Sequence, residues 1–359
     1  MTEKKKILVV DDSALMRSVL CDIINSDRRF QVVDRAINGV EAFDLLTRKQ
    51  YDAVVLDVNM PKMTGIELLK ELQKRKIPAR IMMASTDTME GAKVTMDCLE
   101  LGAIDFIHKP SKAMEARDNT FKEEFIKTLE AVSMSKLPTF EKAFSMDDIK
   151  TTRKMIDIVK KHDKNIVSNQ VVAIACSTGG PKALQQVIPR LPKDLKAPVL
   201  IVQHMPAGFT KSLADRLNTL SELTVKEAEE GDVLTPGTVY LAKGGMHMKV
   251  ITKNSVSQIH FSDEPAREGV KPCANYMYES LVDSPFEQVL CVVMTGMGAD
   301  GTKGIVNLET KKKVHVIVQE ESTCAVYGMP KSVANAGLAD QIVGLEQLSQ
   351  EIIMNVGVR

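Results

Sequence analysis

The sequence predicts two α/β domains, each built on a doubly wound parallel sheet, joined by a polar linker. Apolar runs of strand length alternate with segments of helical periodicity in the first third of the chain, as is typical of βαβ units. A polar, charged stretch follows, and then a second series of apolar runs. These observations predict a first domain over residues 1–132, a linker over 133–168 and a second domain over 169–359.

Length, composition and charge fit this organisation. A chain of 359 residues with 44% hydrophobic content can build about two domains with real cores. Its 47 basic and 47 acidic residues cancel, so no net positive field exists to hold nucleic acid or an anionic membrane. We therefore expect no nucleic-acid partner and no insertion into a membrane.

The N-terminal segment and the cysteines indicate the compartment. The apolar run 7–10, which precedes Asp11 and Asp12, is too short for a signal peptide or a membrane span. The six cysteines form no C-x-x-C pair, and most lie within apolar runs, as buried thiols do in a reducing compartment. The sequence therefore predicts a cytoplasmic protein.

The elements of the first domain are predicted from periodicity. Apolar runs predict buried parallel strands at 7–10, 53–56 and 80–84. Apolar residues spaced by three or four positions predict helices around 15–23, 40–46 and 121–132.

The second domain opens with a strand-like run at 171–174, and further runs at 198–203 and 289–294 also predict buried strands. Three segments separated by turn residues predict a small antiparallel meander, at 237–242, 248–251 and 257–261. Within the linker, four apolar residues predict one short docking helix: Met155, Ile156, Ile158 and Val159.

Charged and polar residues end the predicted strands of the first domain. Asp11 and Asp12 follow the strand at 7–10, which is counted as the first, and Asp57 follows the strand at 53–56, counted as the third. Ser85 follows the strand at 80–84, counted as the fourth, and Lys109 ends a fifth. Carboxylates that meet at one sheet edge repel each other unless a hard cation joins them, and Mg²⁺ prefers such oxygen ligands. A carboxylate beside that ion can accept a phosphoryl group. Any one of these aspartates alone would be a helix cap, but together they favour a phosphoacceptor site.

Over residues 4–132 this pattern resembles the receiver domain of two-component response regulators, whose doubly wound sheet is flavodoxin-like. The resemblance implies Mg²⁺-dependent phosphorylation of Asp57. It also implies a set of supporting roles: Asp11, Asp12, Asp57 and the Asn59 carbonyl as Mg²⁺ ligands, Lys109 as the phosphate partner, Ser85 as the switch hydroxyl and Phe106 as the aromatic ring that moves with it. A cis peptide bond at Lys109–Pro110 is implied as well.

In the second domain, Ser177, His204 and Asp300 each follow a predicted strand. Open α/β sheets place their sites at the carboxyl ends of the strands, so a nucleophile, a base and an orienting acid are predicted to meet there. After Ser177 the strand turns into a helix whose first N–H groups can face negative charge. The chain order Ser–His–Asp differs from the Ser–Asp–His order of α/β-hydrolases, which indicates a hydrolase on another fold.

Alternatives exist for each of these residues. His247, in a Gly-rich turn, is a second candidate for the base, whereas His260 and His315 lie inside predicted strands and favour structural roles. Taken singly, Ser177 would be a helix N-cap and Asp300 a turn residue.

The segment Gly296–Gly301 raises a different possibility, because it matches G-x-G-x-x-G directly after a strand. Glu320 then follows at about the position of a ribose-binding acid in a dinucleotide fold. The pattern comes late in its domain, behind the strands that present Ser177 and His204. We therefore favour a hydrolase over nucleotide binding.

Four segments within residues 169–355 resemble the catalytic domain of the CheB family of chemotaxis protein-glutamate methylesterases: 177–181, 203–209, 295–301 and 328–330. The resemblance implies Ser177 as nucleophile, His204 as general base and Asp300 as its orienting acid. It places Thr178 and the Met297 N–H beside the oxyanion. Residues 269–275 depart from the family's pattern, so we assign them no binding role.

The resemblance also implies a reaction and partners. The reaction is hydrolysis of glutamyl γ-methyl esters, and deamidation of some glutamines, on methyl-accepting chemotaxis receptors, through a glutamyl-serine ester and without a cofactor. A chemotaxis histidine kinase would be the phosphodonor. The competing class is a receiver joined to a DNA-binding module, which the neutral charge and the lack of a recognisable helix-turn-helix disfavour.

Overall fold

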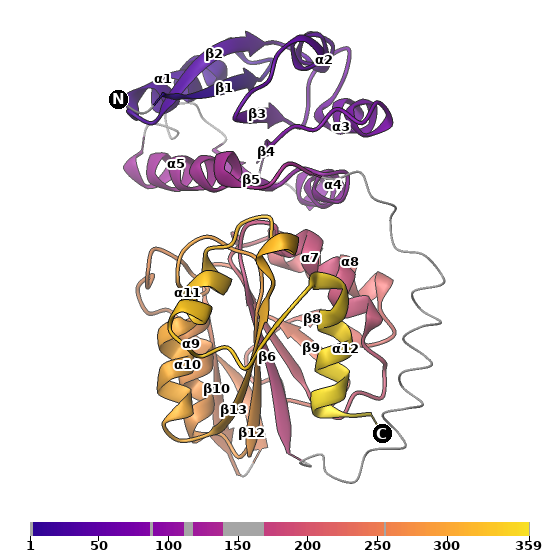
Figure 1. Ribbon diagram of the computed structural model, residues 1–359, viewed down its shortest axis with the longest axis vertical. Helices are drawn as coiled ribbons and strands as arrows, with labels where there is room; N and C mark the ends of the chain where they lie inside the picture. Colours follow the sequence, from indigo (N-terminus) through magenta and orange to yellow (C-terminus); the bar gives the residue numbers. More distant parts are fainter. Residues whose placement is uncertain (1–2, 87–88, 111–117, 139–168, 255, 359) are drawn as a thin grey trace. The chain divides into compact units, whose positions relative to one another are not determined.

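The computed structural model describes residues 3–86, 89–110, 118–138, 169–254 and 256–358, apart from the side chains of 86, 89 and 90. The chain divides into two compact units, residues 1–141 and 142–359, each with one parallel sheet between helices (Figure 1). Most of the predicted linker, with its docking helix, lies outside the described residues.

The first unit alternates strands with helices, and its five parallel strands have the order β2-β1-β3-β4-β5. This is the flavodoxin-like doubly wound order, which confirms the predicted fold class. The elements are β1 (Lys5–Val10), α1 (Ala14–Ser26), β2 (Phe30–Ala36), α2 (Gly39–Arg48), β3 (Ala53–Asp57), α3 (Gly65–Lys74), β4 (Ile81–Thr86), α4 (Met89–Glu100), β5 (Asp105–Lys109) and α5 (Asn119–Met134).

Helices α1 and α5 cover one face of this sheet, and α2, α3 and α4 cover the other (Figure 1). Strand β3 is buried along its whole length because both of its faces are covered. Of the three positions whose spacing predicted helix α1, Val19 and Ile23 are buried, whereas Leu15 is 61% exposed. The full buried stripe contains Met16, Val19, Leu20, Ile23 and Ile24.

The second unit has a seven-stranded sheet in the order β14-β13-β12-β6-β7-β9-β8, in which every described pairing is parallel. Helices α7, α8 and α12 pack on one face, and α9, α10 and α11 pack on the other (Figure 1). Buried side chains of α9, α10 and α11 form one core with the central strands. Strands β6 and β12 are buried throughout, as continuous apolar runs predict.

The elements of the second unit are β6 (Gln170–Cys176), α7 (Gly180–Val187), η3 (Ile188–Arg190), β7 (Val199–Gln203), α8 (Phe209–Leu220), β8 (Thr224–Glu227), β9 (Thr238–Leu241), β10 (His247–Lys253), β11 (Val256–Ser262), α9 (Ala274–Ser280), η4 (Leu281–Asp283), β12 (Gln288–Val293), α10 (Thr302–Glu309), β13 (Lys313–Gln319), η5 (Glu321–Thr323), α11 (Met329–Asn335), β14 (Gln341–Val343) and α12 (Leu345–Val356).

The predicted antiparallel meander is correct for two of its three strands. β10 and β11 form an antiparallel hairpin. The first segment, β9, instead pairs in parallel with β7 and β8 inside the main sheet. Its residues Val239, Tyr240 and Leu241 are buried, and main-sheet pairing satisfies that burial better than an exposed hairpin would. Among the described helices, none has the length and apolar character needed to cross a bilayer.

Candidate active site

The carboxyl edge of the first sheet gathers the predicted acidic residues. Asp57 is the last residue of β3, and Asp11 and Asp12 follow β1, the neighbouring strand. One carboxylate oxygen of each lies within 4.8 Å of the others. Asp11 and Asp57 are buried, whereas Asp12 is exposed. Converging carboxylates of this kind fit a hard divalent cation such as Mg²⁺.

Lys109 stands between two of these carboxylates. Its Nζ lies 2.8 Å from Asp11 Oδ2 and 2.8 Å from Asp57 Oδ2. Burial acts to lower the pKa of Lys109, but the charges of Asp57 and Asp11 outweigh it, and the net shift is upward. Lys109 is therefore cationic and is placed to pair with negative charge added at Asp57.

The other predicted residues of this site lie on β4, β5 and the loop after β3. Ser85 is buried, and its hydroxyl donates a hydrogen bond to the Gly91 carbonyl at 3.4 Å. Phe106 is buried on β5, and Asn59 is exposed two residues after Asp57. The expected cis bond at Lys109–Pro110 is wrong: in the described ranges the cis peptide bond is Lys271–Pro272.

Ser177 stands at the centre of the carboxyl edge of the second sheet. It follows β6, which lies between β12 and β7, the strands that lead to Asp300 and His204. Gly179, with φ of +79°, lets the chain reverse into α7. The Ser177 carbonyl accepts the Gly180 N–H at 2.7 Å and closes the turn. The half-buried serine thus sits just before the N-terminus of a helix.

His204 and Asp300 meet beside this serine. The ring nitrogen Nε2 of His204 lies 2.8 Å from Asp300 Oδ2. The backbone N–H of His204 donates to the Cys176 carbonyl at 3.1 Å. Because Nε2 faces the carboxylate, Nδ1 is the nitrogen left to accept a proton. Within the described ranges the Ser177 hydroxyl forms no hydrogen bond with the imidazole. Such contacts often tighten only when substrate binds.

Asp300 is held by four donors. Oδ2 accepts from His204 and from the Ala274 N–H at 2.6 Å, and Oδ1 accepts from the Asn275 N–H at 2.9 Å and from Cys273 Sγ at 3.0 Å. Burial acts to raise the pKa of Asp300, but His204, Cys273 and the backbone donor at Ala274 outweigh it and lower that pKa to about 2. Asp300 therefore remains an anion that orients its imidazole partner.

Residues 269–275 have no predicted role, yet three of them donate hydrogen bonds to Asp300. Cys273, Ala274 and Asn275 form what we call the Asp300 cradle. The N–H groups of Ala274 and Asn275 begin helix α9, so the Asp300 carboxylate caps that helix from a distant part of the chain. Asn275 in turn accepts the N–H groups of Gly301 and Gly304 at the start of α10, at 3.1 and 2.7 Å. Because Ala274 and Asn275 hold Asp300 through backbone N–H groups, no signal in the sequence marked this role.

Replacement of Cys273 is expected to test the cradle. Burial, and after it the charge of Asp300, raises the pKa of Cys273 to about 12, so its thiol stays protonated and can donate. Cys273→Ala should lower the free energy of unfolding by about 1–3 kcal/mol more than Cys291→Ala does, because a hydrogen bond to a charged group is lost. Chemical denaturation measures both. Cys291 is the matched control, a fully buried thiol in the core.

Cys273→Ser retains a donor and should recover most of this difference in unfolding free energy. Equal losses in Cys273→Ala and Cys291→Ala would show that the sulfur contributes packing alone.

The glycines of the G-x-G-x-x-G segment are explained by the approach of this loop to the serine. A Cβ on Gly296 would lie 2.7 Å from Ser177 Cβ, so no larger residue fits there. Gly298 and Gly301 have φ of +93° and +98°, which favours glycine. The Ser177 N–H also donates to the Thr295 carbonyl at 3.0 Å. The segment therefore brings the Asp300 loop against Ser177 without any need for a dinucleotide.

The competing histidines have other partners. His247 is fully buried, its Nε2 lies 3.2 Å from the Pro265 carbonyl, and its ring centroid is 4.6 Å from that of Tyr276. Burial lowers its pKa, which favours a neutral structural imidazole. His260 contacts Glu230 from β11, and His315 contacts Gln341 and Asp340 from β13. The geometry therefore favours His204 as the base.

The two residues expected beside the oxyanion each adjoin in sequence a residue at the serine turn: Thr178 follows Ser177, and Met297 follows Gly296. Thr178 is buried, and its carbonyl accepts the Thr295 hydroxyl at 3.0 Å. Met297 is half-buried and follows Gly296, whose carbonyl accepts the Gly328 N–H at 2.9 Å. The hydroxyl of Thr295 therefore joins the serine turn to the Asp300 loop.

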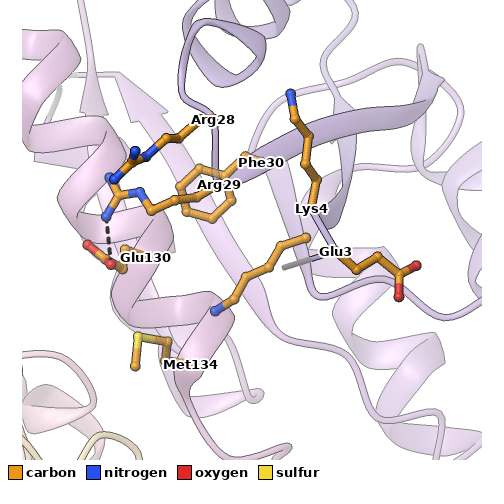
Figure 2. Close-up of a pocket in the computed structure, with 8 residues that line it drawn as sticks. Glu3, Lys4, Arg28, Arg29, Phe30, Glu130 and Met134 are labelled. Carbon is orange, nitrogen blue, oxygen red and sulfur yellow. Dashed lines mark ion pairs between the residues drawn. The ribbon is translucent and has the colours of Figure 1, made fainter. Parts of the chain in front are cut away.

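A hollow on the first unit lies away from these residues. Figure 2 shows Lys4, Arg28 and Arg29 around it, near the starts of β1 and β2, whereas the aspartates lie at the opposite ends of the strands. Arg29 is 2.6 Å from Glu130 and also pairs with Asp27. Its charge is already balanced within the unit, and we assign the hollow no function.

These two sites define a response regulator whose output domain is an α/β enzyme with serine, histidine and aspartate at neighbouring strand ends. Family comparison agrees with both parts. Residues 7–120 match the response regulator receiver domain, and residues 172–352 match the CheB methylesterase domain. The chain belongs to the CheB methylesterase family.

Relatives of similar length support this membership. The chain is 40% identical to a protein-glutamate methylesterase/protein-glutamine glutaminase of Syntrophomonas wolfei, over 98% of this chain and 99% of the relative. It is 38% identical to the protein of the same name from Bacillus subtilis, over 97% of each. The crystal structure of the Thermotoga maritima CheB methylesterase catalytic domain, 40% identical, matches with a TM-score of 0.50 over 52% of this chain and 98% of that one.

Proposed function

We propose that this chain is a phosphorylation-activated protein-glutamate methylesterase and protein-glutamine glutaminase that acts through Ser177, His204 and Asp300. The observation that carries the proposal is the 2.8 Å contact between His204 and Asp300 beside β6, the strand that Ser177 directly follows. The names of the full-length relatives support the substrate class.

The reaction follows from the chemistry of these groups. His204 Nδ1 takes the proton of the Ser177 hydroxyl as Oγ attacks the γ-carbonyl carbon of the ester. The imidazolium then gives the proton to the departing methoxide, so methanol leaves and a glutamyl-serine ester remains. Water, activated by the same imidazole, hydrolyses that ester and restores the serine. With glutamine the leaving group is ammonia, and the remaining steps are the same.

Charge develops on the carbonyl oxygen during attack. We assign the Met297 N–H and Thr178 to the border of this oxyanion, because Thr178 follows Ser177 in the chain and Met297 follows Gly296, which closely approaches Ser177. A donor at that position stabilises the transition state more than the ground state. Asp300 stabilises the imidazolium that forms at His204. The esterase reaction needs no cofactor in this scheme.

The substrate and partners follow from the family. We propose that the substrates are methyl-accepting chemotaxis receptors and that a chemotaxis histidine kinase is the phosphodonor. Methanol release from methylated receptor membranes is the experiment that tests this function directly. Release that requires the chain supports the proposal, and its absence with an active donor and receptor would refute it.

The receiver unit supplies the regulation. Asp11, Asp12 and Asp57 would hold Mg²⁺ together with the Asn59 carbonyl, and the ion would neutralise charge during phosphoryl transfer to Asp57. Lys109 would then pair with the new phosphoryl charge, and Ser85 and Phe106 would move with it. We propose that the receiver restrains the esterase until Asp57 is phosphorylated.

Asp57→Asn is expected to abolish stimulation of the esterase by a small phosphodonor with Mg²⁺, so that the stimulated and basal rates become equal. The amide cannot form the acyl phosphate. Initial rates of methanol release with and without phosphodonor measure the effect. Asp44→Asn, at an exposed aspartate on α2, is the matched control and should keep the stimulation.

A fragment covering residues 169–359 tests whether the receiver restrains the esterase or activates it in another way. If the receiver restrains it, the fragment should release methanol faster than the unphosphorylated full chain. Equal rates would show that the receiver acts by recruiting substrate and not by restraint.

A further inference from the structure

Gln203 links the backbones of the two residues that exchange the proton. It is the last residue of β7, directly before His204, and only 1% of it is exposed. Its Nε2 donates to the Ser177 carbonyl at 2.9 Å and to the His204 carbonyl at 3.1 Å. One side-chain amide thus spans the turn that carries the nucleophile and the loop that carries the base.

The orientation of this amide follows from its neighbours. Both nearby acceptors are carbonyl oxygens, so only the NH₂ group can face them. The other end, Oε1, is buried, and among the described residues it has no hydrogen-bond partner. A Cβ on Gly180 would lie 2.0 Å from Oε1, so the amide fits only because residue 180 is glycine.

Stability alone does not explain an amide at this position. A buried oxygen without a partner is unfavourable, and an apolar side chain of the same length would avoid that cost. An apolar side chain would, however, lose the two hydrogen bonds to the backbone carbonyls of Ser177 and His204. The Ser177 carbonyl already accepts the Gly180 N–H at 2.7 Å, so the amide fills its second acceptor position. The turn is then fixed from both sides.

We propose that Gln203 is a positioning residue that sets the distance between the Ser177 hydroxyl and the His204 imidazole. The proposal rests on the proposed function, because it assigns a supporting role within the same reaction. A nucleophile and base must be held within near-attack distance, and a displacement of about 1 Å costs on the order of 10²-fold in rate. Gln203 acts through the backbone carbonyls of Ser177 and His204, so it positions the reacting groups rather than taking part in the reaction.

Gln203→Met in the full chain tests the proposal, because methionine has a similar length and no donor. We expect kcat for methanol release to fall about 10- to 100-fold while KM changes less than about twofold. The rate constant for labelling of Ser177 by a fluorophosphonate should fall in parallel. Partial unfolding would lower the labelled amount but not that rate constant, so a loss of folded protein is distinguished from misplacement.

Val202→Ala is the matched control, since Val202 is fully buried on the same strand and contacts the core rather than the site. It should lower stability while kcat and the labelling rate constant stay within about threefold of wild type. Gln203→Met with wild-type rate constants, or with no greater loss than Val202→Ala, would overturn the inference. A wild-type chain that releases no methanol would overturn the proposed function and the inference together.

Discussion

Ser177→Ala is expected to lower methanol release from methylated receptors by about 10⁴- to 10⁶-fold, the loss found when a triad nucleophile is removed. The neighbouring side chains cannot replace the hydroxyl. Cys176 is fully buried within β6, and burial raises the pKa of its thiol, so no reactive thiolate is available. Thr178 is also buried. Steady-state methanol release at saturating receptor measures the effect.

Ser212→Ala on α8 is the matched control for this prediction and should keep near wild-type activity. Phosphorylation of Asp57 should be unchanged in both variants, because that carboxylate belongs to the other unit. Near-normal methanol release by Ser177→Ala would remove the basis for the triad and for every role assigned around it.

The positions of these site residues were predictable because of a property of parallel sheets. The carboxyl ends of neighbouring parallel strands meet at one edge, so a polar residue after a buried apolar run is placed near others of its kind. This principle predicted both the cluster of Asp11, Asp57 and Lys109 and the contact of His204 with Asp300. The principle applies to these residues because the functional group of each is in its side chain and because each lies at or just after the end of its strand.

The supporting contacts were not predictable in this way. Ala274 and Asn275 hold Asp300 through backbone N–H groups, which every residue other than proline has, so their sequence carries no sign of the role. Gln203 adjoins His204 in sequence, yet its bond to the Ser177 carbonyl depends on the space that Gly180 leaves.

The misplaced strand has a similar cause. β9 precedes a Gly-containing turn, which predicted a local hairpin. The structure instead pairs Val199 with Val239, a partner 40 residues away in sequence, because both faces of β9 can then be covered. Local turn signals cannot report such a tertiary preference.

His204→Ala is expected to lower methanol release by about 10³- to 10⁵-fold and so to decide between the two candidate bases. Its imidazole contacts Asp300 at 2.8 Å and lies beside the strand end that carries Ser177. Without it, the serine keeps its proton and the methoxide has no proton donor. Fluorophosphonate labelling of Ser177 should slow to a comparable extent, since that reaction also needs an activated hydroxyl.

His247→Gln provides the contrast. Its amide nitrogen takes the place of ring Nε2 and can still donate to the Pro265 carbonyl, which His247 Nε2 contacts at 3.2 Å, so the fold around it should persist. Because His247 is fully buried against Tyr276 and its Nε2 already contacts Pro265, we expect its replacement to change kcat by less than about tenfold. A greater loss of kcat in His247→Gln than in His204→Ala, with both variants folded, would move the base to His247. Asp300 would then be left as a helix cap for α9, with no part in proton transfer.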